Sequence, residues 1–547
     1  SIPLEQVAKY VTLERAELVD AELRAGRAVV LVLSHLGSWE VLAQIFGQHF
    51  GHVPLASIFQ PLGNRYIDAD VRRTRERGGI KLLDRREGFQ QAIAILREGG
   101  VIGVLSDQHA GDHGLWTPFF GRLASTTPLP GLLARRTGAA VISAAILTDA
   151  PARWRMIFSE RISGAGDSVE SITAKANDAI AHQIRTAPED WFWVHNRWKT
   201  PRPNFLLAKY KRGVYVPSEH RMSDLQQFRI LIRGTNWLGD SVISAAAVRA
   251  IKRGRPDAHI TVAAPAKLAA VWRLVPEVDE VLGLPDGGLM SVVSLLKKQQ
   301  PFEVAVLLPN SLRAALEVWL AGIPRRVGFA GHHRAWLLNQ VVPEPPRTGP
   351  ISHQVNRYLH LAETLGAVID TAAQPVVRPT QNGAGPMKIG LCPGAEYGPA
   401  KRWLTERFAE VATAVAGERA VQWILFGTVA DAKVGGQIAA VLGERCTNRI
   451  GQTTLDELIA ELRECALLLT NDTGTMHLAT LLGVPVVAVF GSTEPRLTGP
   501  LRDDNVVIRH HVECSPCFLR ECPIDFRCMH AVTSEEVTAR VLEKLPS

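Results

Sequence analysis

Residues 229–249, RILIRGTNWLGDSVISAAAVR, organise this chain, because the residues before them and the residues after them each form a complete unit of their own. The apolar residues 230–232 predict a short buried strand, 234–239 a glycine-bracketed loop, and the Ala-rich run from Ser241 a helix. Ligands of open α/β sheets bind outside the carboxyl ends of the strands, so Asp240 is a candidate site residue. The same position equally suits an aspartate that only caps the helix.

Strand and helix patterns alternate through the rest of the chain. Strands are predicted for HITVAAP, VDEVLGLP and FEVAVLLPNS. The pattern is interrupted at 374–386, QPVVRPTQNGAGP. It resumes in MKIGLCPGA, VQWILFGT, ALLLTNDTGTMHLATLLG and VPVVAVFG. Such alternation predicts an α/β fold with parallel, doubly wound sheets. We therefore expect two Rossmann-like domains, at 229–373 and 387–547.

The composition is that of a globular protein with several domains. With 547 residues, 46% of them hydrophobic and 21% charged, the chain predicts three domains and little disorder. A net charge of +7 favours an anionic partner such as a nucleotide, a phosphorylated lipid or an acidic membrane surface, and no nucleic-acid motif is present. The sparse cysteines fit a reducing, cytoplasmic setting, and no apolar run approaches the ~18 residues that span a bilayer. A start at Ser1 rather than Met leaves room for a truncated front end that carried an anchor.

The first half contains its own candidate site. A buried-strand run, AVVLVL, ends in SHLGSWE, and His35 and Glu40 of this segment converge if His35 lies in the turn and Glu40 in the first helical turn. A histidine oriented by a carboxylate is a general base for a hydroxyl nucleophile. The alternative is a satisfied histidine at a strand end beside an ordinary N-terminal glutamate. A second buried strand, GGVIGVLSDQ, ends in Asp107 and Gln108, and basic residues between Arg72 and Arg86 suit phosphates or a plain solvated face.

The connection between the halves opens with TPRPN and shows no clear periodicity. We therefore predict a first domain at 1–212 and a linker at 213–228. The boundary between the two halves is expected near Val216.

The second half holds an anion-binding pattern. In LLLTNDTGTMH, at 467–477, a strand delivers Asn471 and Asp472 to a turn, and the next helix offers its free N-terminal amides to an anion such as a pyrophosphate. Lys401 can supply a cation to a leaving diphosphate. The alternatives are a solvated lysine and an ordinary N-cap aspartate.

Four cysteines cluster near the end of the chain with the spacing C-x2-C-x4-C-x5-C. Four thiols in so short a segment can hold Zn²⁺, but the spacing is not a regular zinc pattern, so free thiols and conditional disulfides stay open. The residues are Cys514, Cys517, Cys522 and Cys528.

Three blocks of the first half occur in the order found in bacterial lipid A late acyltransferases: SHLGSWE, SDQ with PFFG downstream, and PEDWFWVHNRWK. The first half resembles this family, which is part of the lysophospholipid acyltransferase superfamily. The resemblance implies a membrane-associated α/β domain that transfers an acyl chain from acyl carrier protein or acyl-CoA to a lipid A precursor. It implies that His35 removes the acceptor proton, that Glu40 orients His35, and that Asp107 and Gln108 border the substrate.

The second half resembles the ADP-heptose:lipopolysaccharide heptosyltransferases, through RILIRGTNWLGDSVIS, LPNSLRAAL, AGIPRRVGF, PGAEYGPAKRW and TNDTGTMHLA. The resemblance implies a GT-B fold and inverting transfer of heptose to the lipopolysaccharide inner core, with Asp240 as general base and no required cofactor. Lys401 would neutralise the diphosphate. The residues implied to border the donor are Asp472, Thr473, Gly474 and His477, and those implied to hold the acceptor are Asn310, Ser311 and Arg313.

The sequence thus predicts a bifunctional enzyme at the cytoplasmic face of the bacterial inner membrane. One alternative makes the first half an idle module that only docks on membrane or substrate. Another keeps the glycosyltransferase and changes its donor to a different nucleotide sugar.

Overall fold

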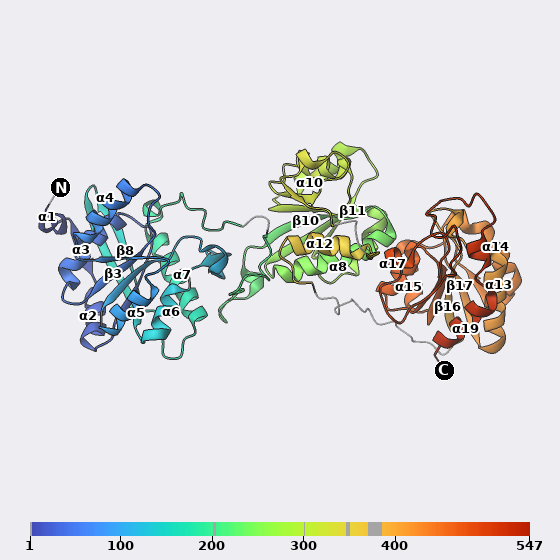
Figure 1. The fold of residues 1–547 in the computed structure, drawn as a ribbon, viewed down its shortest axis with the longest axis horizontal. Coiled ribbons are helices and arrows are strands. Elements are labelled where there is room, and N and C mark those ends of the chain that lie inside the picture. Colours follow the sequence, from blue (N-terminus) through green and yellow to red (C-terminus); the bar gives the residue numbers. More distant parts are fainter. Residues whose placement is uncertain (1–2, 201–203, 300, 346–349, 370–384, 547) are drawn as a thin grey trace. The chain divides into compact units, whose positions relative to one another are not determined.

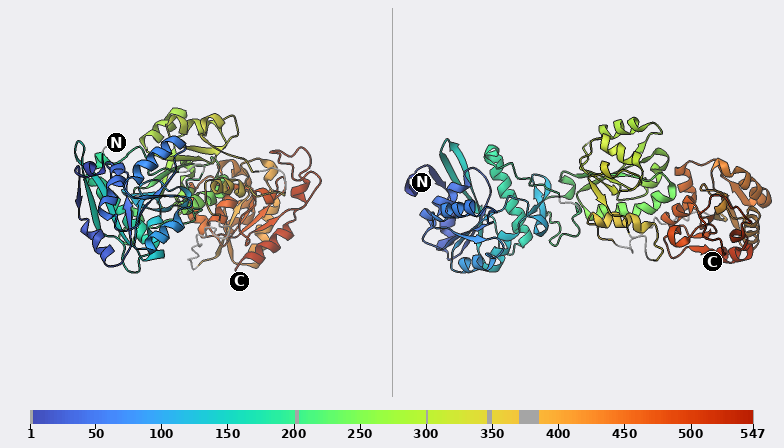
Figure 2. Two further views of the ribbon diagram at one scale, coloured as in Figure 1. Left: turned by 60° about the vertical axis from the view of Figure 1, so that its left-hand side comes forward. Right: turned by 45° about the horizontal axis from the view of Figure 1, so that its top comes forward.

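The computed structural model describes residues 3–200, 204–299, 301–345, 350–369 and 385–546. Contacts divide the chain into two compact units, Ser1–Gln227 and Phe228–Ser547. In both units helices cover the large sheets (Figure 1 and Figure 2). The predicted α/β class is confirmed. Of the break expected at 374–386, residues 374–384 lie outside the described residues.

The first unit is built on a seven-stranded sheet of order β1-β9-β8-β2-β5-β3-β4. Its strands are β1 (Val11–Glu14), β2 (Val29–Leu33), β3 (Leu55–Phe59), β4 (Lys81–Asp84), β5 (Val101–Leu105), β8 (Ala140–Ala150) and β9 (Arg153–Arg161). Neighbouring strands are parallel except β8 and β9. Because β2 and β5 are parallel neighbours, the residues that follow them meet at one edge of the sheet.

Both faces of this sheet are covered, which explains the unbroken apolar run in β2. Alternate residues of a strand face opposite sides, and Val30 and Val32 pack with α5 (Phe89–Arg97), α6 (Leu129–Thr137) and α7 (Val169–Thr186). Leu31 and Leu33 pack on the other side with α2 (Glu17–Arg24) and α3 (Trp39–Phe50).

A hairpin of β6 (Leu115–Phe119) and β7 (Arg122–Thr126) carries the PFFG turn. The segment expected as a linker packs on this hairpin. Val214 pairs with Trp116, and the Gln226 N–H donates to the Gly121 carbonyl at 2.7 Å. The residues up to Gln227 therefore belong to the first unit.

The second unit contains two six-stranded parallel sheets, of order β12-β11-β10-β13-β14-β15 and β18-β17-β16-β19-β20-β21. The first consists of β10 (Phe228–Arg233), β11 (Ala258–Pro265), β12 (Glu280–Leu284), β13 (Val304–Leu307), β14 (Arg326–Phe329) and β15 (Gln340–Val342). The second consists of β16 (Met387–Cys392), β17 (Val421–Leu425), β18 (Cys446–Asn448), β19 (Leu467–Asn471), β20 (Val486–Val489) and β21 (Val506–Ile508). Both Rossmann-like sheets were predicted, and both are confirmed.

Each of these sheets has a topological switch point, where the chain passes from one side of the starting strand to the other. In the first sheet it lies between β10 and β13, and in the second between β16 and β19. The loops after these strands are therefore where ligands are expected.

Helices connect the strands and pack on both sheets. The longer ones are α4 (Arg65–Glu76) in the first unit, and α8 (Leu238–Gly254), α10 (Leu289–Lys298), α11 (Leu312–Leu320), α12 (Val355–Thr364), α13 (Thr405–Glu418), α14 (Ala432–Leu442), α15 (Leu455–Arg463), α16 (Gly474–Leu481) and α19 (Ser534–Lys544) in the second. Among the helices of the described ranges, none has both the length and the apolar character needed to cross a membrane.

Helix α8 begins at Leu238, three residues before the predicted start at Ser241. Its N-cap is Trp237, which makes no side-chain capping bond. Asp240 therefore lies in the first helical turn, and the interpretation of Asp240 as a simple cap is wrong.

Candidate functional sites

The first site joins the loops after β2 and β5. His35 Nδ1 lies 2.7 Å from Asp107 Oδ1, and the backbone N–H of His35 donates to Asp107 Oδ2 at 2.8 Å. Trp191 Nε1 donates to the same Oδ2 at 2.9 Å. Burial raises the pKa of Asp107, but the hydrogen bond and charge of His35 and the bond from Trp191 outweigh it, so this pKa lies below its ordinary value. A carboxylate only accepts hydrogen bonds, so in this pair the proton lies on His35 Nδ1 and His35 Nε2 is left as an acceptor.

The base nitrogen of His35 faces two further side chains. Gln108 Nε2 lies 3.2 Å from His35 Nε2 and 2.7 Å from His195 Nε2. The imidazole rings of the two histidines are 5.1 Å apart, edge to face. Gln108 was predicted to border the substrate, and it occupies the place where a substrate hydroxyl would meet the base. His195 was not singled out from the sequence, because nothing in WVHNRW marks a histidine that faces a distant loop.

Glu40 does not orient His35, so that part of the sequence interpretation is wrong. The Glu40 carboxylate accepts from Arg75 Nε at 2.9 Å and from Arg75 Nη2 at 2.6 Å. Burial raises the pKa of Glu40, but the bonds and charge of Arg75 bring it below its ordinary value. The fold explains this choice of partners, because β5 places Asp107 beside His35 and α4 places Arg75 beside Glu40. Asp107 is fully buried, so its predicted role in binding substrate is also corrected to holding His35.

An apolar pocket that is partly open to solvent lies next to His35, and its empty space, including the solvent-filled part, is about 680 Å³. Ser34 and Trp39, on either side of the His35 turn, line it, and the Trp39 ring is 5.1 Å from the His35 ring. Gly103 forms part of its floor, and Arg75 is the one charged residue of its lining. Apolar walls with few polar groups are typical of small-molecule sites.

The second site begins with Asp240. Gln354 Nε2 donates to Asp240 Oδ1 at 2.7 Å, and α12 packs beside α8. Burial raises the pKa of Asp240, although the Gln354 bond lowers it. Burial and the charge of Asp240 together raise the pKa of Tyr358 to about 12. The other oxygen, Asp240 Oδ2, makes no hydrogen bond within the described part of the chain, and a carboxylate with a raised pKa and an available oxygen suits a general base.

The turn that carries Asp240 lies directly against α16. A Cβ at Gly239 would come within 3.0 Å of His477 Cδ2, and a Cβ at Gly474 would come within 2.9 Å of Leu238 Cβ. The two glycines therefore let the N-termini of α8 and α16 touch. This contact brings Asp240 of the first sheet to the loop of the second sheet that contains Asp472.

The predicted donor residues gather at the switch point of the second sheet. Lys401 Nζ lies 2.5 Å from Asp472 Oδ2, and Thr493 Oγ1 donates to the same oxygen at 2.7 Å. The Asn471 side chain ties the two loops together, because it accepts from the Trp403 N–H at 2.9 Å and donates to the Pro393 carbonyl at 2.7 Å. Thr493 was not predicted, and its only signal is its place just after the VPVVAVFG strand.

Thr473 and His477 lie at the N-terminal end of α16. Thr473 is the N-cap, and its hydroxyl accepts from the Thr475 N–H at 3.1 Å. Burial lowers the pKa of His477 to about 4, despite the charge of Asp472, so His477 is neutral near pH 7. The positive end of the helix and Lys401 are then the cationic features facing this loop.

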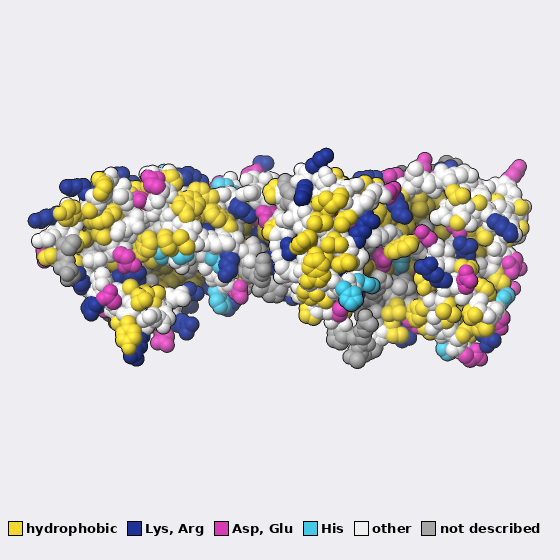
Figure 3. All heavy atoms as spheres, turned by 90° about the horizontal axis from the view of Figure 1, so that it is seen from above, with side chains coloured by type: hydrophobic (Ala, Val, Ile, Leu, Met, Phe, Trp, Pro, Cys, Tyr) yellow, Lys and Arg dark blue, Asp and Glu magenta, His cyan; other side chains and the backbone are white. Residues whose placement is uncertain are grey.

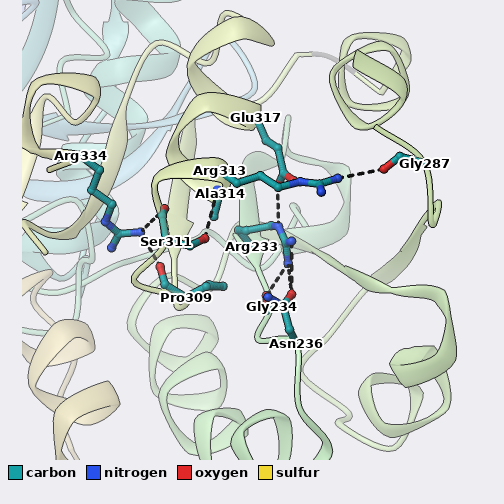
Figure 4. A network of polar contacts seen from close by, with 10 residues as sticks. All are labelled: Arg233, Gly234, Asn236, Gly287, Pro309, Ser311, Arg313, Ala314, Glu317 and Arg334. Atoms are coloured by element: carbon teal, nitrogen blue, oxygen red, sulfur yellow. Dashed lines mark hydrogen bonds and ion pairs between the residues drawn. The ribbon is translucent and has the colours of Figure 1, made fainter. Parts of the chain in front are cut away.

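The residues predicted to hold the acceptor lie after β13, and Ser311 and Arg313 belong to the network of Figure 4. The Ser311 hydroxyl caps α11 by accepting from the Ala314 N–H at 3.3 Å. Arg313 Nη2 donates to the Gly287 carbonyl at 2.9 Å and Arg313 Nε to Glu317 at 3.2 Å. Asn310 Oδ1 is buried and has no hydrogen-bond partner among the described residues. Arg313 stays more than half exposed, so it can still meet an anionic ligand.

Behind this loop, Glu317 joins two arginines. Arg233 Nε donates to Glu317 Oε2 at 2.8 Å, and both side chains are buried, while Arg313 meets the other carboxylate oxygen (Figure 4). The buried Arg334 donates to the carbonyls of Phe329, Pro309 and Ser311. These bonds fix the ends of β10, β13 and β14 relative to one another.

The four clustered cysteines line one cavity of about 430 Å³. Burial raises the pKa of Cys528, and the charges of Cys514, Cys517 and Cys522 raise it further. Among the residues with described positions, no group of three or more His, Cys, Asp or Glu side chains is arranged to hold a metal ion. Zinc binding, one of the three alternatives left open by the spacing of these cysteines, therefore gains no support from the described residues.

Comparisons with known proteins match both units. The model of glycosyltransferase family 9 (heptosyltransferase) matches residues 292–526, and that of the bacterial lipid A biosynthesis acyltransferases matches residues 1–200. Lipopolysaccharide heptosyltransferase 2 of Escherichia coli (strain K12) is 35% identical over 310 residues, which cover 51% of this chain and 88% of that protein. Lipid A biosynthesis palmitoleoyltransferase of the same strain is 25% identical over 201 residues, covering 36% of this chain and 64% of that protein.

A solved structure agrees with the sequence match. The E. coli ADP-heptose lipopolysaccharide heptosyltransferase II superposes with a TM-score of 0.50 at 30% identity, covering 58% of this chain and 98% of that chain. The two-sheet unit thus shares the GT-B architecture of a heptosyltransferase. The first unit is similar to the bacterial lipid A biosynthesis acyltransferases over residues 1–200. The chain is an enzyme that belongs to glycosyltransferase family 9, the heptosyltransferases.

Proposed function

We propose that the chain is a bifunctional enzyme of lipopolysaccharide biosynthesis. Unit Phe228–Ser547 transfers heptose from ADP-heptose to the inner core with inversion, and unit Ser1–Gln227 transfers an acyl chain from a thioester to a lipid A precursor. The observation that carries the glycosyl transfer is the Lys401–Asp472 pair at α16, set against the turn that bears Asp240. We assign acceptor binding to 229–373 and donor binding to 387–547.

In the proposed glycosyl transfer, Asp240 removes the proton from an acceptor hydroxyl. The hydroxyl oxygen attacks the anomeric carbon while the bond to the ADP oxygen breaks, so the configuration inverts in one displacement. The free amides of α16 and the Lys401 ammonium neutralise the departing diphosphate. These groups supply the required positive charge, and no cofactor is part of the proposal.

A mass-spectrometric assay tests the glycosyl transfer. Purified full-length chain is incubated with ADP-heptose and a truncated lipopolysaccharide acceptor, and the expected product is heavier by one heptose. Asp240→Asn should abolish the gain. Calorimetry with ADP, UDP and GDP tests the donor, and tighter binding of UDP than of ADP would contradict the heptose assignment.

The acyl transfer rests on the His35–Asp107 pair beside the apolar cavity. His35 Nε2 takes the proton of the acceptor hydroxyl, and the hydroxyl oxygen attacks the thioester carbonyl. The C–S bond then breaks, and the thiolate takes the proton back from His35. The cavity receives the hydrocarbon chain, whose thioester belongs to acyl carrier protein or coenzyme A.

The second candidate for this unit is a docking module without catalysis, because Gln108 covers the base nitrogen in this structure. Release of free thiol from an acyl thioester, measured with a lipid A precursor, decides between the two. Release by the wild type but not by His35→Ala supports acyl transfer. No release by either protein, with heptose transfer intact, supports the docking module.

We further propose that the second unit docks on a membrane surface, at the cytoplasmic face of the inner membrane. Trp319 on α11 and Trp336 on η5 (Ala335–Leu337) are 43% and 68% exposed, and their rings lie 6.0 Å apart. Leu312 lies two turns before Trp319 on the same helix and is also exposed. Paired exposed tryptophans are typical of the boundary between lipid and water.

Charge favours an anionic lipid surface as the partner of this face. In the described part of 289–339 the exposed charged side chains are basic, and no acidic side chain there is exposed. Figure 3 shows hydrophobic atoms gathered on one face of the middle part of the chain, with Lys and Arg atoms beside them. The exposed basic residues of this stretch are Lys297, Lys298 and Arg313. Each Lys or Arg near an anionic bilayer contributes about 1 kcal/mol.

A further inference from the structure

The base nitrogen of His35 is already occupied by a side chain of the protein. Gln108 Nε2 lies within hydrogen-bonding distance of both His35 Nε2 and His195 Nε2. An amide nitrogen is only a donor, and its two hydrogens match two acceptors. Both Nε2 atoms therefore act as acceptors in these contacts, and the His35 lone pair that would accept a substrate proton accepts from Gln108 instead.

We propose that Gln108 and His195 form a gate on the His35 base, which closes the base to water and opens when the acceptor hydroxyl arrives. The inference rests on the proposed acyl transfer. Gln108 is a positioning residue that donates to His35 Nε2 in the resting state. The acceptor hydroxyl replaces that donor, and the amide stays on His195.

The gate prevents a wasteful side reaction. An open His35 can deprotonate water as readily as an acceptor hydroxyl. Water then attacks the thioester carbonyl, the C–S bond breaks, and the products are a free fatty acid and a thiol that takes the proton. An acyl thioester held beside an open base would be consumed in this way before the acceptor binds.

His195 is held where a second anchor is needed. The loop that carries it is tied to the His35 turn, because the Phe192 N–H donates to the His35 carbonyl and the Gly37 N–H to the Asp190 carbonyl, both at 2.9 Å. The shorter contact of Gln108 is the one to His195. The Gln108 side chain is exposed and its carbonyl oxygen has no hydrogen-bond partner among the described residues, so the amide can leave His35 at little cost. Burial lowers the pKa of His195, which favours its role as an acceptor.

Thiol release with and without acceptor tests the gate in the full-length enzyme. Gln108→Ala should raise acceptor-independent release about threefold to tenfold, which is the range expected from removing one neutral hydrogen bond, while acceptor-dependent transfer falls. His195→Ala should raise the KM for the acceptor with little change in kcat, and His195→Gln should restore it. Gln91→Ala, at an exposed glutamine of α5, is the matched control. A parallel fall of both reactions in Gln108→Ala would overturn the proposal.

A measurement that needs no turnover separates this inference from the proposed activity. Nitrogen-15 spectra of the histidine side chains at neutral pH should show His35 and His195 as neutral Nδ1–H tautomers in the wild type. In Gln108→Ala both Nε2 resonances should move toward the position of a nitrogen without a donor. Unchanged resonances would overturn the gate even in an active enzyme. Changed resonances in an enzyme without thiol release would support the contact and reject acyl transfer.

Discussion

Gly239 of α8 and His477 of α16 are in contact, so closely that a single methyl group at Gly239 would come within 3.0 Å of His477 Cδ2. Gly239 precedes the proposed base, and His477 belongs to α16, the helix proposed to face the donor diphosphate. The contact therefore couples the two halves of the glycosyl transfer site. Any side chain at Gly239 must push α8 and α16 apart or displace the His477 ring.

We expect Gly239→Ala to lower the kcat of heptose transfer about tenfold, because a displacement of about 1 Å between reacting groups can cost more than that. The affinity for ADP should change less than threefold. Initial rates and calorimetry measure the two quantities. Gly417→Ala is the control, since a Cβ there meets nothing within 4 Å, and an equal loss in both variants would contradict the coupling.

Asp240→Asn should lower heptose transfer by a factor of about 10² to 10⁴, the usual contribution of a general base, with ADP affinity unchanged. The wild-type rate should fall as pH decreases through the pKa of Asp240, because only the carboxylate accepts a proton. Burial raises that pKa, so the fall should begin at a higher pH than for an ordinary aspartate. Gln354→Leu removes the hydrogen bond that lowers the pKa of Asp240, so the fall in rate should occur at a still higher pH. A fall that moves to lower pH in this variant would exclude Asp240 as the titrating group.

Asp107→Asn and Glu40→Gln should differ sharply in acyl transfer. Asp107 fixes the tautomer of His35, so its replacement should cost at least about 100-fold in kcat, whereas Glu40→Gln should cost less than about tenfold. Thiol release measures the rates, and a thermal melt separates lost activity from lost folding. The opposite order would restore Glu40 as the residue that orients His35.

Thr493→Val should weaken ADP binding about threefold to tenfold. Its hydroxyl shares Asp472 Oδ2 with Lys401, and without it the carboxylate draws more strongly on the lysine that the diphosphate needs. Calorimetry with ADP gives the dissociation constant. Thr413→Val, at an exposed threonine that bonds only within its own helix, should leave that constant unchanged.

Trp319→Ser combined with Trp336→Ser should reduce binding of the full-length chain to vesicles that contain anionic lipid by about tenfold, while heptose transfer to a soluble acceptor analogue stays intact. Co-sedimentation with vesicles of neutral and of mixed anionic lipid measures binding. Val429→Ser with Val441→Ser is the control, because these exposed apolar residues lie on η7 (Val429–Asp431) and α14, away from the tryptophan pair in the sequence. Light scattering that shows a dimer of the wild type but a monomer of the tryptophan variant would instead assign this face to a second copy of the chain.

Much of the fold could be predicted because its signals are local. Strands buried on both faces appear as unbroken apolar runs such as AVVLVL, and their alternation with helices fixes parallel sheets. The sequence could also place Lys401 and Asp472 in one pocket. Both residues follow predicted parallel strands of the second Rossmann-like domain, and the loops after such strands meet at one edge of the sheet. The start of α8 could not be fixed so well, because Trp237 takes the N-cap position without a capping side chain.

The partner of His35 could not be predicted, and the reason is general. The sequence offered Glu40 five residues away, but Asp107 lies 72 residues away along the chain and reaches His35 because β2 and β5 are neighbours. Thr493, Gln354, Arg75 and His195 came to their partners in the same way, through strand order and helix packing.

The sequence by itself determined the class of fold, the two Rossmann-like sheets, and which loops carry polar residues, because these depend on hydrophobic period and on turn residues close along the chain. Only the tertiary structure decided which of those polar residues meet. Hydrogen bonds between side chains form over about 3 Å, and whether two loops come that close depends on the order of strands in a sheet rather than on their spacing in the chain.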